Sequence, residues 1–332
     1  SPFVSIIRPL SGLDFMLYQN LETSFTQDYT NFEIIFSVHS PNDPSIPVVK
    51  KLMSKYPNVD AKIIIDECTY GVNPKVSNMV EAYKQAKYDL LWVCDSNVYL
   101  NKGTLGRALV ELIKPEVGLV HHLPIGLQAQ SFGAMLDAIF LNTTHAKLYS
   151  AVNFLKLDSC VMGKSCLYRK SDFEKFGGME AATKVLAEDH WIAKNIWDLG
   201  LKHVMVEDLI YQPMGEMPLS SFFGRRSRWL RLRKYISMLS ILLEPFTECV
   251  LNGLIASYSF SSIFSIHPLN FFAFHVVTWF ALDLITFQSL IGKPVSDFRK
   301  YMVAWGFREV SALPLFLYSI LGNSLNWRGK DY

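Results

Sequence analysis

Polar residues suited to a phosphorylated ligand follow three apolar runs in the N-terminal part of the chain. They are Asp43, Gly71, Asn73, Lys75 and Asp95. An aspartate such as Asp43 accepts hydrogen bonds from a base or ribose, while Gly71 and Asn73 permit close approach of the backbone to a phosphate. Lys75 offers positive charge at a helix N-terminus, and Asp95 is a candidate ligand for a divalent cation, Mg²⁺ or Mn²⁺. Each residue alone is more often a turn or cap residue, but the repetition predicts a nucleotide-diphosphate pocket.

An acidic pair, Glu188-Asp189, opens a helical stretch further along the chain. Such a pair has a routine explanation, because carboxylates complement the dipole in the first turn of a helix. The functional interpretation is a general base, Asp189, opposite a bound nucleotide sugar, with Glu188 on the acceptor side. The apolar neighbours Trp191 and Ile192 favour a raised pKa for the Asp189 carboxyl.

The segment Ser220–Lys234 (SSFFGRRSRWLRLRK) combines arginines with large apolar residues. On a helix, Arg225, Arg228 and Trp229 share one face, which suits a diphosphate clamp that also contacts an apolar acceptor. A basic helix on anionic headgroups is an equally good interpretation of the segment alone. Both can hold if Arg225, Arg228 and Trp229 face the pocket. The residues expected to meet the bilayer are then Phe222, Phe223, Leu230, Arg231 and Arg233.

The elements that must position these residues alternate between strands and helices. Expected strands are Val4–Leu10, Phe32–Val38, Lys62–Ile65, Asp89–Cys94, Val117–Pro124 and Cys160–Arg169. Expected helices are Asp14–Phe25, Pro47–Tyr56, Lys75–Ala86, Ser131–Tyr149 and Ala187–Leu199. Alternation of this kind predicts an α/β fold with a mainly parallel sheet. Ligands of such sheets bind at the carboxyl ends of the strands, where the polar residues stand.

The C-terminal part contains three apolar segments that suit a membrane. They are Cys249–Ile266, Pro268–Phe287 and Val310–Leu325. The alternative, a buried helical core, is disfavoured because the three segments cluster at one end of the chain. Asp283 interrupts the second segment and must face protein or water, since a carboxylate is costly in lipid.

Composition excludes other classes of protein. The formal charge of +2 does not indicate a nucleic-acid binder, and the five dispersed cysteines favour a reducing compartment over a disulfide framework. The chain has neither GxGxxG nor GxxxxGK[ST], which argues against a Rossmann dehydrogenase or a P-loop NTPase. His121 and His122 are interpreted as strand-end residues rather than metal ligands. The start at Ser1 suggests a fragment.

The ordered set of Asp43, Asp95, Asp189 and the RRSRW motif at Arg225–Trp229 resembles the D, D, D, (Q/R)xxRW pattern of inverting GT-A glycosyltransferases. More closely, the chain is similar to the ceramide glucosyltransferases over essentially its whole length. The stretches that carry this likeness are Asn20–Thr23, Lys55–Ala61, Asn73–Lys75, Ala86–Leu90, Val117–His121, Ser165–Leu167, Ala187–Asp189 and Ala304-Trp305.

The resemblance implies a role for each matched residue. Asp43 would be the first aspartate, on the nucleotide side, Asp95 the second, at the metal and diphosphate, and Asp189 the base that removes a proton from the acceptor hydroxyl. The terminal motif would close over the diphosphate and border the acceptor channel; its members are Arg225, Arg228 and Trp229. His145 lies in a segment that resembles one linked in the family to acceptor binding.

The resemblance also implies an overall organisation. It predicts a cytosolic GT-A domain over residues 1–219, an interfacial segment over 220–247 and a membrane region over 248–332. The expected activity is inverting transfer of glucose from UDP-glucose to ceramide, in the Golgi membrane or the ER. A homo-oligomer is among the states that the sequence leaves open.

Two departures from the broader superfamily bear on the site. The usual DxD acid pair is Asp95-Ser96-Asn97 here, so the turn has one carboxylate and the cation would rely on diphosphate oxygens and water. The terminal motif begins with Arg225 in place of Gln. A processive polysaccharide synthase and a catalytically silent membrane scaffold remain as alternatives.

Overall fold

The computed structural model describes residues 1–156, 159–327 and 330–331, and it comprises two compact units. Unit 1 consists of Ser1–Pro124 and Tyr149–Pro213, and unit 2 of Ile125–Leu148 and Met214–Tyr332. Residues 328, 329 and 332 of the predicted membrane region lie outside the described ranges. The segment between Ile125 and Leu148 belongs to unit 2, although it lies between two parts of unit 1 in the sequence.

The described residues of unit 1 are built on a seven-stranded sheet with the order β3-β2-β1-β4-β6-β5-β7. The strands are β1 Val4–Leu10, β2 Phe32–Val38, β3 Ala61–Ile65, β4 Leu90–Cys94, β5 Val117–Ala129, β6 Ser165–Arg169 and β7 Lys202–Gly215. β1 to β4 pair in parallel, whereas β6 runs antiparallel to β4 and to β5. This confirms the predicted α/β fold with a mixed, mainly parallel sheet.

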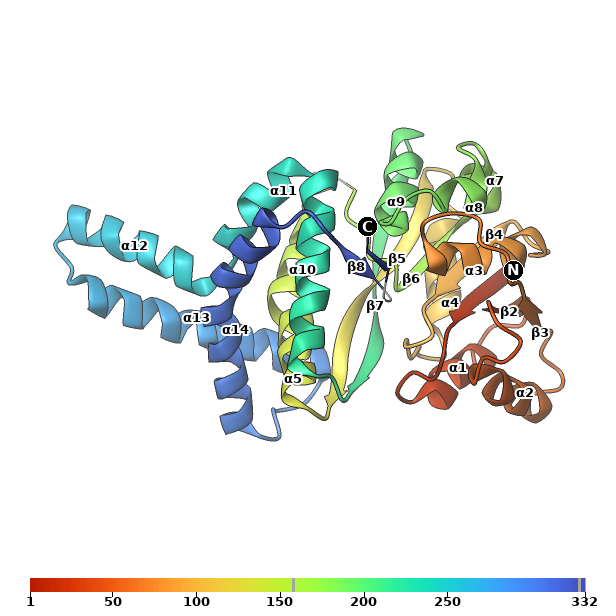
Figure 1. Ribbon diagram of the computed structural model, residues 1–332, viewed down its shortest axis with the longest axis horizontal. Helices are drawn as coiled ribbons and strands as arrows, with labels where there is room; N and C mark the ends of the chain where they lie inside the picture. Colours follow the sequence, from red (N-terminus) through yellow and green to blue (C-terminus); the bar gives the residue numbers. More distant parts are fainter. Residues whose placement is uncertain (157–158, 328–329, 332) are drawn as a thin grey trace. The chain divides into compact units, whose positions relative to one another are not determined.

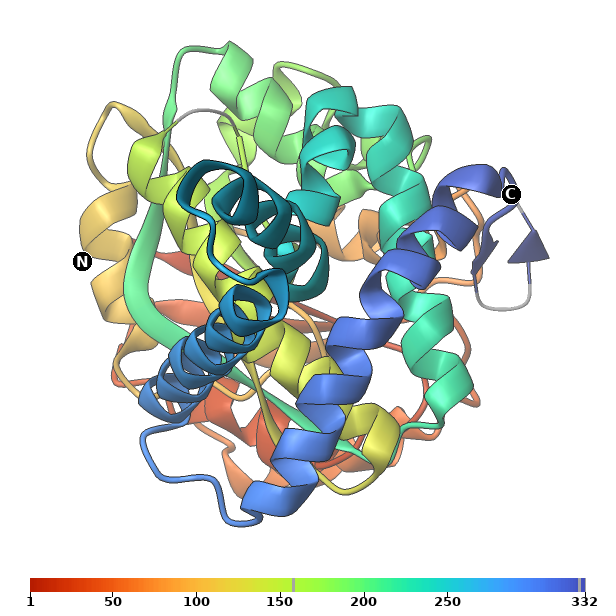
Figure 2. The same cartoon turned by 90° about the vertical axis from the view of Figure 1, so that its left-hand side faces the viewer.

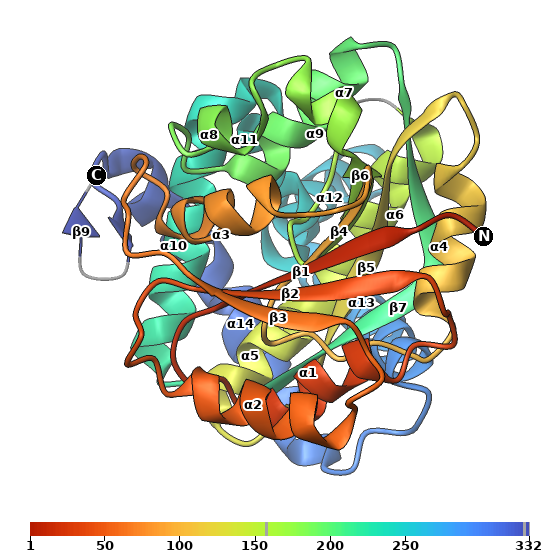
Figure 3. The same ribbon diagram turned by 90° about the vertical axis from the view of Figure 1, so that its right-hand side faces the viewer.

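Helices cover both faces of this sheet (Figure 3). Alternate residues of the strands point to opposite faces, so Ile6 and Ile34 join one apolar core and Ile7 and Ile35 the other. The first core is closed by α1 Leu17–Phe25, α2 Ser45–Lys55 and α4 Thr104–Leu112. The second is closed by α3 Pro74–Lys84, α7 Lys170–Glu174, α8 Gly178–Ala182 and α9 Glu188–Asp198.

Unit 2 is mainly helical. Its elements are α5 Phe132–Phe140, the π-helix η1 Leu141–His145, α10 Leu219–Ile236, α11 Met238–Leu243, the 3₁₀ turn η2 Glu244–Thr247, α12 Cys249–Phe264, α13 Pro268–Ile291, α14 Phe298–Leu321 and the short strands β8 Asn326–Trp327 and β9 Lys330–Asp331. After η1 the chain continues as α6 Ala146–Leu155. α10 and α14 lie side by side and both contact α5, while α12 and α13 form a hairpin (Figure 1, Figure 2).

Among the described residues, α13 is the helix long and apolar enough to cross a membrane. Most of its surface is exposed, and apolar side chains such as Phe274 and Val277 point outward. α12 is apolar but shorter, with 16 residues. The predicted third segment, Val310–Leu325, covers only the C-terminal half of α14, whose N-terminal half carries the buried pair Arg308-Glu309.

Some sequence-based element assignments were incomplete. α4 and β7 were not predicted, and the predicted strand Cys160–Arg169 is a strand only from Ser165. His121 and His122 were expected at a strand end but lie buried within the long β5. Burial lowers the pKa of His121 to about 3 and that of His122 to about 4, so both are neutral.

Asp283 of α13 is fully buried against other parts of unit 2. Its carboxylate accepts from Lys147 Nζ at 2.6 Å and from Trp305 Nε1 at 2.8 Å. An unpaired carboxylate inside an apolar helix layer would be costly, and these donors remove that cost. The interaction therefore fixes α13 to α14 and to the segment that follows η1.

Replacing Asp283 with Ala should destabilise unit 2, because the buried Trp305 Nε1 loses its acceptor while Lys147 loses its ion pair. Leaving a buried donor without an acceptor typically costs about 1–3 kcal/mol, to which the lost ion pair adds. Thermal unfolding of the purified protein in detergent measures the effect. Asp297→Ala is a control at the N-cap of α14, where the side chain accepts from Lys300 N and loss of a cap costs about 1 kcal/mol. Equal shifts of Tm in the two variants would contradict the structural role of Asp283.

Candidate active site

Lys75 brings three strand-end segments of unit 1 together. It lies in the first turn of α3, and its Nζ is 2.8 Å from Asp95 Oδ1 and 3.0 Å from Glu188 Oε1. It also donates to the carbonyl of Gly163 at 3.1 Å. Asp95 directly follows β4, and Glu188 begins α9. The predicted residues Lys75, Asp95 and Glu188 therefore meet at the carboxyl ends of the parallel strands, where ligands of such sheets bind.

A second lysine, Lys164, contacts the same carboxylate. Its Nζ is 3.0 Å from Asp95 Oδ2 and donates to Asn97 Oδ1 at 3.0 Å. Burial alone would raise the pKa of Asp95, but the two ammonium groups outweigh it and hold that pKa well below its usual range. Burial likewise opposes the charge of Lys75, and Asp95 and Glu188 keep its pKa above the usual range. Asp95 and Lys75 are therefore both charged at neutral pH.

Asn73 links the start of α3 to the start of α9. Its Oδ1 accepts from the backbone N–H groups of Lys75 and Val76, which makes it the N-cap of α3. Its Nδ2 donates to Glu188 Oε2 at 2.9 Å. An Asn is suited to this position because one amide supplies both an acceptor and a donor. Asn73 therefore orients the acidic pair rather than pointing freely into a ligand pocket.

Asp189 lies beside this cluster and lines a pocket together with Lys75, Gly163 and Glu188. Its Oδ2 accepts from Gly163 N at 2.9 Å and its Oδ1 from His190 N at 2.8 Å. Burial and the neighbouring Glu188 carboxylate raise the pKa of Asp189 to about 6, with Lys75 opposing the shift. A carboxylate with such a pKa is a stronger base than an ordinary aspartate and is still ionised at neutral pH.

Asp43 and Gly71 have clear local roles in the structure. Asp43 Oδ2 accepts from Gly12 N at 2.9 Å, and its Oδ1 accepts from both the backbone and hydroxyl of Ser45. Asp43 therefore connects the loop after β1 to the start of α2. At Gly71 a Cβ would come within 2.5 Å of the backbone oxygen of Thr183. The close approach that requires glycine here is thus to the protein's own backbone.

Few side chains in this region could coordinate a divalent cation. Among the described residues there is no group of three or more His, Cys, Asp or Glu side chains that could hold a metal ion. Asp95 offers the carboxylate at the turn after β4, and both of its oxygens contact a lysine. This arrangement fits a cation only when other oxygens, such as those of a diphosphate, complete its ligand sphere.

The terminal motif lies on α10 in unit 2. Arg225 Nη1 is 2.9 Å from Oδ2 of the fully buried Asp137, and the Arg225 guanidinium stacks over the Trp229 ring at 4.6 Å from its centroid. Arg228 is half-buried on the same helix. The expectation that Phe222 and Leu230 face outward was wrong, because both are buried within unit 2. Their spacing of four residues, shared with Arg226, places them on one inward stripe.

His145 ends the π-helix η1 in unit 2. Its ring lies 5.7 Å from that of Phe140, measured between centroids. Burial first, and then the charges of Arg233, Arg226 and Arg225, lower the pKa of His145 to about 3. A neutral imidazole next to three guanidinium groups can donate or accept a hydrogen bond with a ligand, but it carries no charge. Its predicted role on the acceptor side stays a prediction.

Three residues that shape these clusters were not predicted from the sequence. Lys164 and Gly163 precede β6, and they meet Asp95 and Asp189 because β6 runs antiparallel to β4. The basic residue before the strand was visible in the sequence, but the direction of the strand was not. Asp137 lies on α5, and no local pattern marked it.

The chain was compared with known proteins. It matches the family model described as glycosyl transferase family 21 over residues 1–332. It is 32% identical to a ceramide glucosyltransferase of Komagataella phaffii, over 99% of this chain and 82% of the relative. It is 34% identical to ceramide glucosyltransferase 1 of Caenorhabditis elegans, over 100% of this chain and 71% of the relative.

A solved structure supports the fold. A mannosyltransferase from Pyrobaculum calidifontis, in complex with GDP-Man and Mn²⁺, superposes with a TM-score of 0.56 at 14% identity, over 97% of this chain and 87% of that one. At this identity the likeness establishes a GT-A-type fold. Together with the family match over the whole sequence, it shows that the chain is a glycosyltransferase and belongs to glycosyl transferase family 21.

Proposed function

We propose that this protein transfers glucose from UDP-glucose to the primary hydroxyl of ceramide, with inversion at the anomeric carbon. The choice of substrates follows the ceramide glucosyltransferases to which the chain is similar over its whole length. The structural observation that carries the proposal is the pocket in unit 1. There, a carboxyl with a pKa raised to about 6, Asp189, lies next to the cluster in which Lys75 pairs with Asp95 and Glu188 and Lys164 pairs with Asp95.

Asp189 is the general base in this proposal. Its backbone donors, Gly163 and His190, hold the carboxylate in one orientation. The carboxylate removes the proton of the acceptor hydroxyl as that oxygen forms a bond to the anomeric carbon and the bond to the UDP oxygen breaks. A base placed in this way typically contributes about 10²–10⁴-fold to the rate.

The positive groups of unit 1 stabilise the departing diphosphate. Lys75 and Lys164 are fixed by their contacts to Asp95, so their charges are already in place when negative charge develops on UDP. Asp43 is assigned to the nucleotide side, with its carboxylate ordering the loop around Gly12. Asp95 would hold a divalent cation together with diphosphate oxygens, and such a cation supplies further neutralisation of the leaving group.

Arg225, Arg228 and Trp229 are proposed to act on the diphosphate and on the acceptor. The ion pair with Asp137 and the stacking on Trp229 support a fixed orientation of the Arg225 guanidinium. A preorganised arginine loses little conformational entropy when it binds a phosphate. His145 and Glu188 are assigned to the acceptor side.

The protein is further proposed to act at a membrane with its catalytic part in the cytosol, in the Golgi or the ER. Support comes from the exposed apolar surface of α13 and from the arginines of α10, which precede the apolar helices and favour the cytosolic side. UDP-sugars are made in the cytosol, and ceramide lies in the bilayer. This placement gives the enzyme access to both substrates.

Purified protein incubated with labelled UDP-glucose and ceramide should produce a lipid with one β-linked glucose.

Asp189→Asn should lower kcat by at least about 10²-fold, because the amide cannot accept the proton. Binding of UDP-glucose, followed by calorimetry, should persist. Asp198→Asn, at the exposed end of the same helix, is the matched control. A product with several sugars would instead indicate a polysaccharide synthase, and full turnover by Asp189→Asn would exclude this residue as the base.

The pH dependence of the reaction should report the raised pKa of Asp189. A base must be deprotonated, so kcat/KM should fall as the pH decreases through about 6. Glu188→Gln removes the negative charge that helps to raise this pKa, and the falling limb should move to lower pH. Glu180→Gln, an exposed glutamate, should leave the limb in place. If kcat/KM of Glu188→Gln falls at the same pH as in the unaltered protein, a group other than Asp189 titrates there.

Binding of Mn²⁺ should depend on the nucleotide. Without UDP, a cation must compete with Lys75 and Lys164 for the oxygens of Asp95, so calorimetry should detect weak binding or none. Addition of UDP supplies diphosphate oxygens, and binding should then become measurable and be lost in Asp95→Asn. Equally tight binding of Mn²⁺ with and without UDP would place the cation elsewhere.

A further inference from the structure

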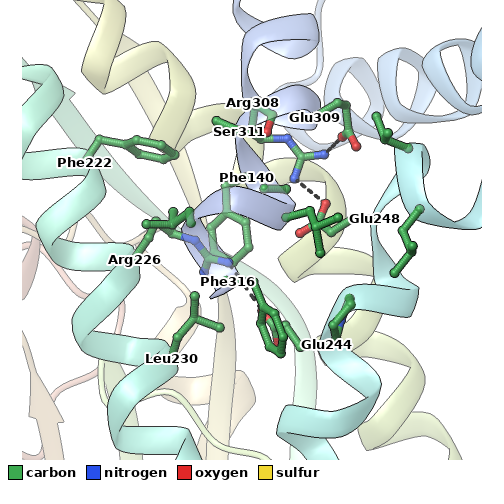
Figure 4. Close-up of a pocket in the computed structure, with 16 residues that line it drawn as sticks. Phe140, Phe222, Arg226, Leu230, Glu244, Glu248, Arg308, Glu309, Ser311 and Phe316 are labelled. Atoms are coloured by element: carbon green, nitrogen blue, oxygen red, sulfur yellow. Dashed lines mark hydrogen bonds and ion pairs between the residues drawn. The ribbon is translucent and has the colours of Figure 1, made fainter. Parts of the chain in front are cut away.

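Unit 2 contains a pocket that none of the proposed catalytic residues lines. It lies between α10, α14, η2 and the start of α12, with Phe140 of α5 on one side (Figure 4). About 560 Å³ of unfilled space lies within it, part of which is open to the surroundings. Its apolar wall is formed largely by Phe140, Phe222, Leu230, Leu251, Leu313 and Phe316.

Two buried arginines point into this pocket from opposite sides (Figure 4). Arg226 is only 5% exposed to solvent, and Arg308 only 3%. Arg226 Nη2 is 3.4 Å from Glu244 Oε1. Arg308 Nη1 is 3.2 Å from Glu248 Oε2, and the same guanidinium also pairs with Glu309. The Arg226 guanidinium lies over the Phe140 ring, 3.4 Å from its centroid. Both arginines are thus held in place by acids and by packing.

Each arginine retains a free donor. Within the part of the chain that the structure describes, neither Arg226 Nη1 nor Arg308 Nε has a hydrogen-bond partner. A buried donor without an acceptor is unfavourable, and such groups are rare in folded proteins. A ligand that brings a carbonyl or hydroxyl oxygen into the pocket would satisfy them.

The charges around the pocket favour an uncharged ligand. Its lining includes the positive Arg226 and Arg308 and the negative Glu244, Glu248 and Glu309. Arg233, which pairs with Glu244, brings the two signs into balance. A phosphate group would meet carboxylates here and find no net positive charge. An amide carbonyl or a hydroxyl accepts from an arginine N–H without adding charge.

The apolar wall of the pocket continues onto exposed apolar surface. Leu251 lines the pocket on α12, and Leu254 and Ile255 are exposed on the next turn of that helix. On α14, Phe316 lines the pocket, while Leu317 and Leu321 are exposed. Because α12 forms a hairpin with the candidate membrane helix α13, this surface suits lipid chains. A lipid could therefore leave its chains in the bilayer and place its polar region in the pocket.

We propose that this pocket binds the amide region of the uncharged lipid acceptor, with Arg226 Nη1 donating to the amide carbonyl and the reacting primary hydroxyl left outside the pocket. The inference rests on the proposed function, which supplies ceramide as the acceptor, and it assigns that acceptor to a defined site in unit 2. Phe222, Arg226 and Leu230 form the stripe of α10 that lines this site. Arg225 and Trp229 lie beside that stripe, so one helix carries both the diphosphate motif and the lipid contacts.

Filling the pocket should block the acceptor selectively. Ala312→Trp places a large ring in the pocket, and Val310→Trp is the matched control, because Val310 is 70% exposed on the same helix. Ala312→Trp should raise the KM for ceramide by about tenfold or more, the effect expected when part of a substrate no longer fits an apolar pocket. The calorimetric Kd for UDP-glucose should not change, which also shows that the variant is folded. Val310→Trp should leave both constants unchanged.

Photolabelling tests the site without requiring turnover. Full-length protein in phosphatidylcholine nanodiscs is irradiated with a ceramide that carries a diazirine near its amide, and labelled peptides are mapped. Label should fall on α10, η2 or α14 and be lost in Ala312→Trp. Excess unlabelled ceramide should compete, and excess phosphatidylserine should not.

The outcomes separate this inference from the proposed function. Turnover of ceramide with label outside these elements, or with an unaltered KM in Ala312→Trp, would overturn the assignment of the pocket and leave the function standing. Specific labelling of the pocket without transfer of glucose would retain the lipid site and refute the reaction. Competition by phosphatidylserine as strong as that by ceramide would also overturn the assignment, because it would indicate a general lipid site.

Discussion

The ammonium group of Lys75 determines the arrangement of unit 1 at the carboxyl ends of its parallel strands. Asp95, Glu188 and the Gly163 carbonyl all direct oxygen atoms at it. Two carboxylates this close would repel each other without a cation between them. The lysine therefore allows acidic groups from separate segments to occupy one small region. The same charge opposes the rise in the pKa of Asp189, so that carboxyl stays ionised at neutral pH.

Unit 2 depends on a similar principle with guanidinium groups. Its helices present broad apolar surfaces, and charged residues among them require partners to be stable. Arg225 pairs with Asp137, and Arg308 pairs with Glu248 and Glu309. These pairs connect α5, α10, α12 and α14 through side chains of defined geometry. Arg226 and Arg308 each keep one buried N–H group without an acceptor among the described residues, and such a group is a starting point for recognising an uncharged polar lipid.

Much of unit 1 could be predicted from the sequence. The runs at Val4–Leu10 and Phe32–Val38 became β1 and β2 with the predicted bounds, since β-branched runs bounded by turn residues have few alternatives. The convergence of Asp95 and Lys75 was also predictable, because both follow parallel strands, whose carboxyl ends lie at one edge of the sheet. The antiparallel direction of β6 was not, and with it the contribution of Lys164 was missed. Strand direction depends on pairing between segments distant in sequence, which no local pattern records.

The α/β alternation, the position of acidic residues after strands and the apolar character of the C-terminal helices could be predicted from local sequence. These properties arise from the order and periodicity of side chains along short segments. Other features became visible only in the folded chain: Asn73 orients Glu188, Asp137 holds Arg225, and one stripe of α10 faces inward, made of Phe222, Arg226 and Leu230. Each of these depends on which segments pack together, and that follows from the burial of surfaces across the whole fold. The segment Ser220–Lys234 illustrates the difference, since its composition revealed a basic apolar helix but only packing showed which of its faces is covered.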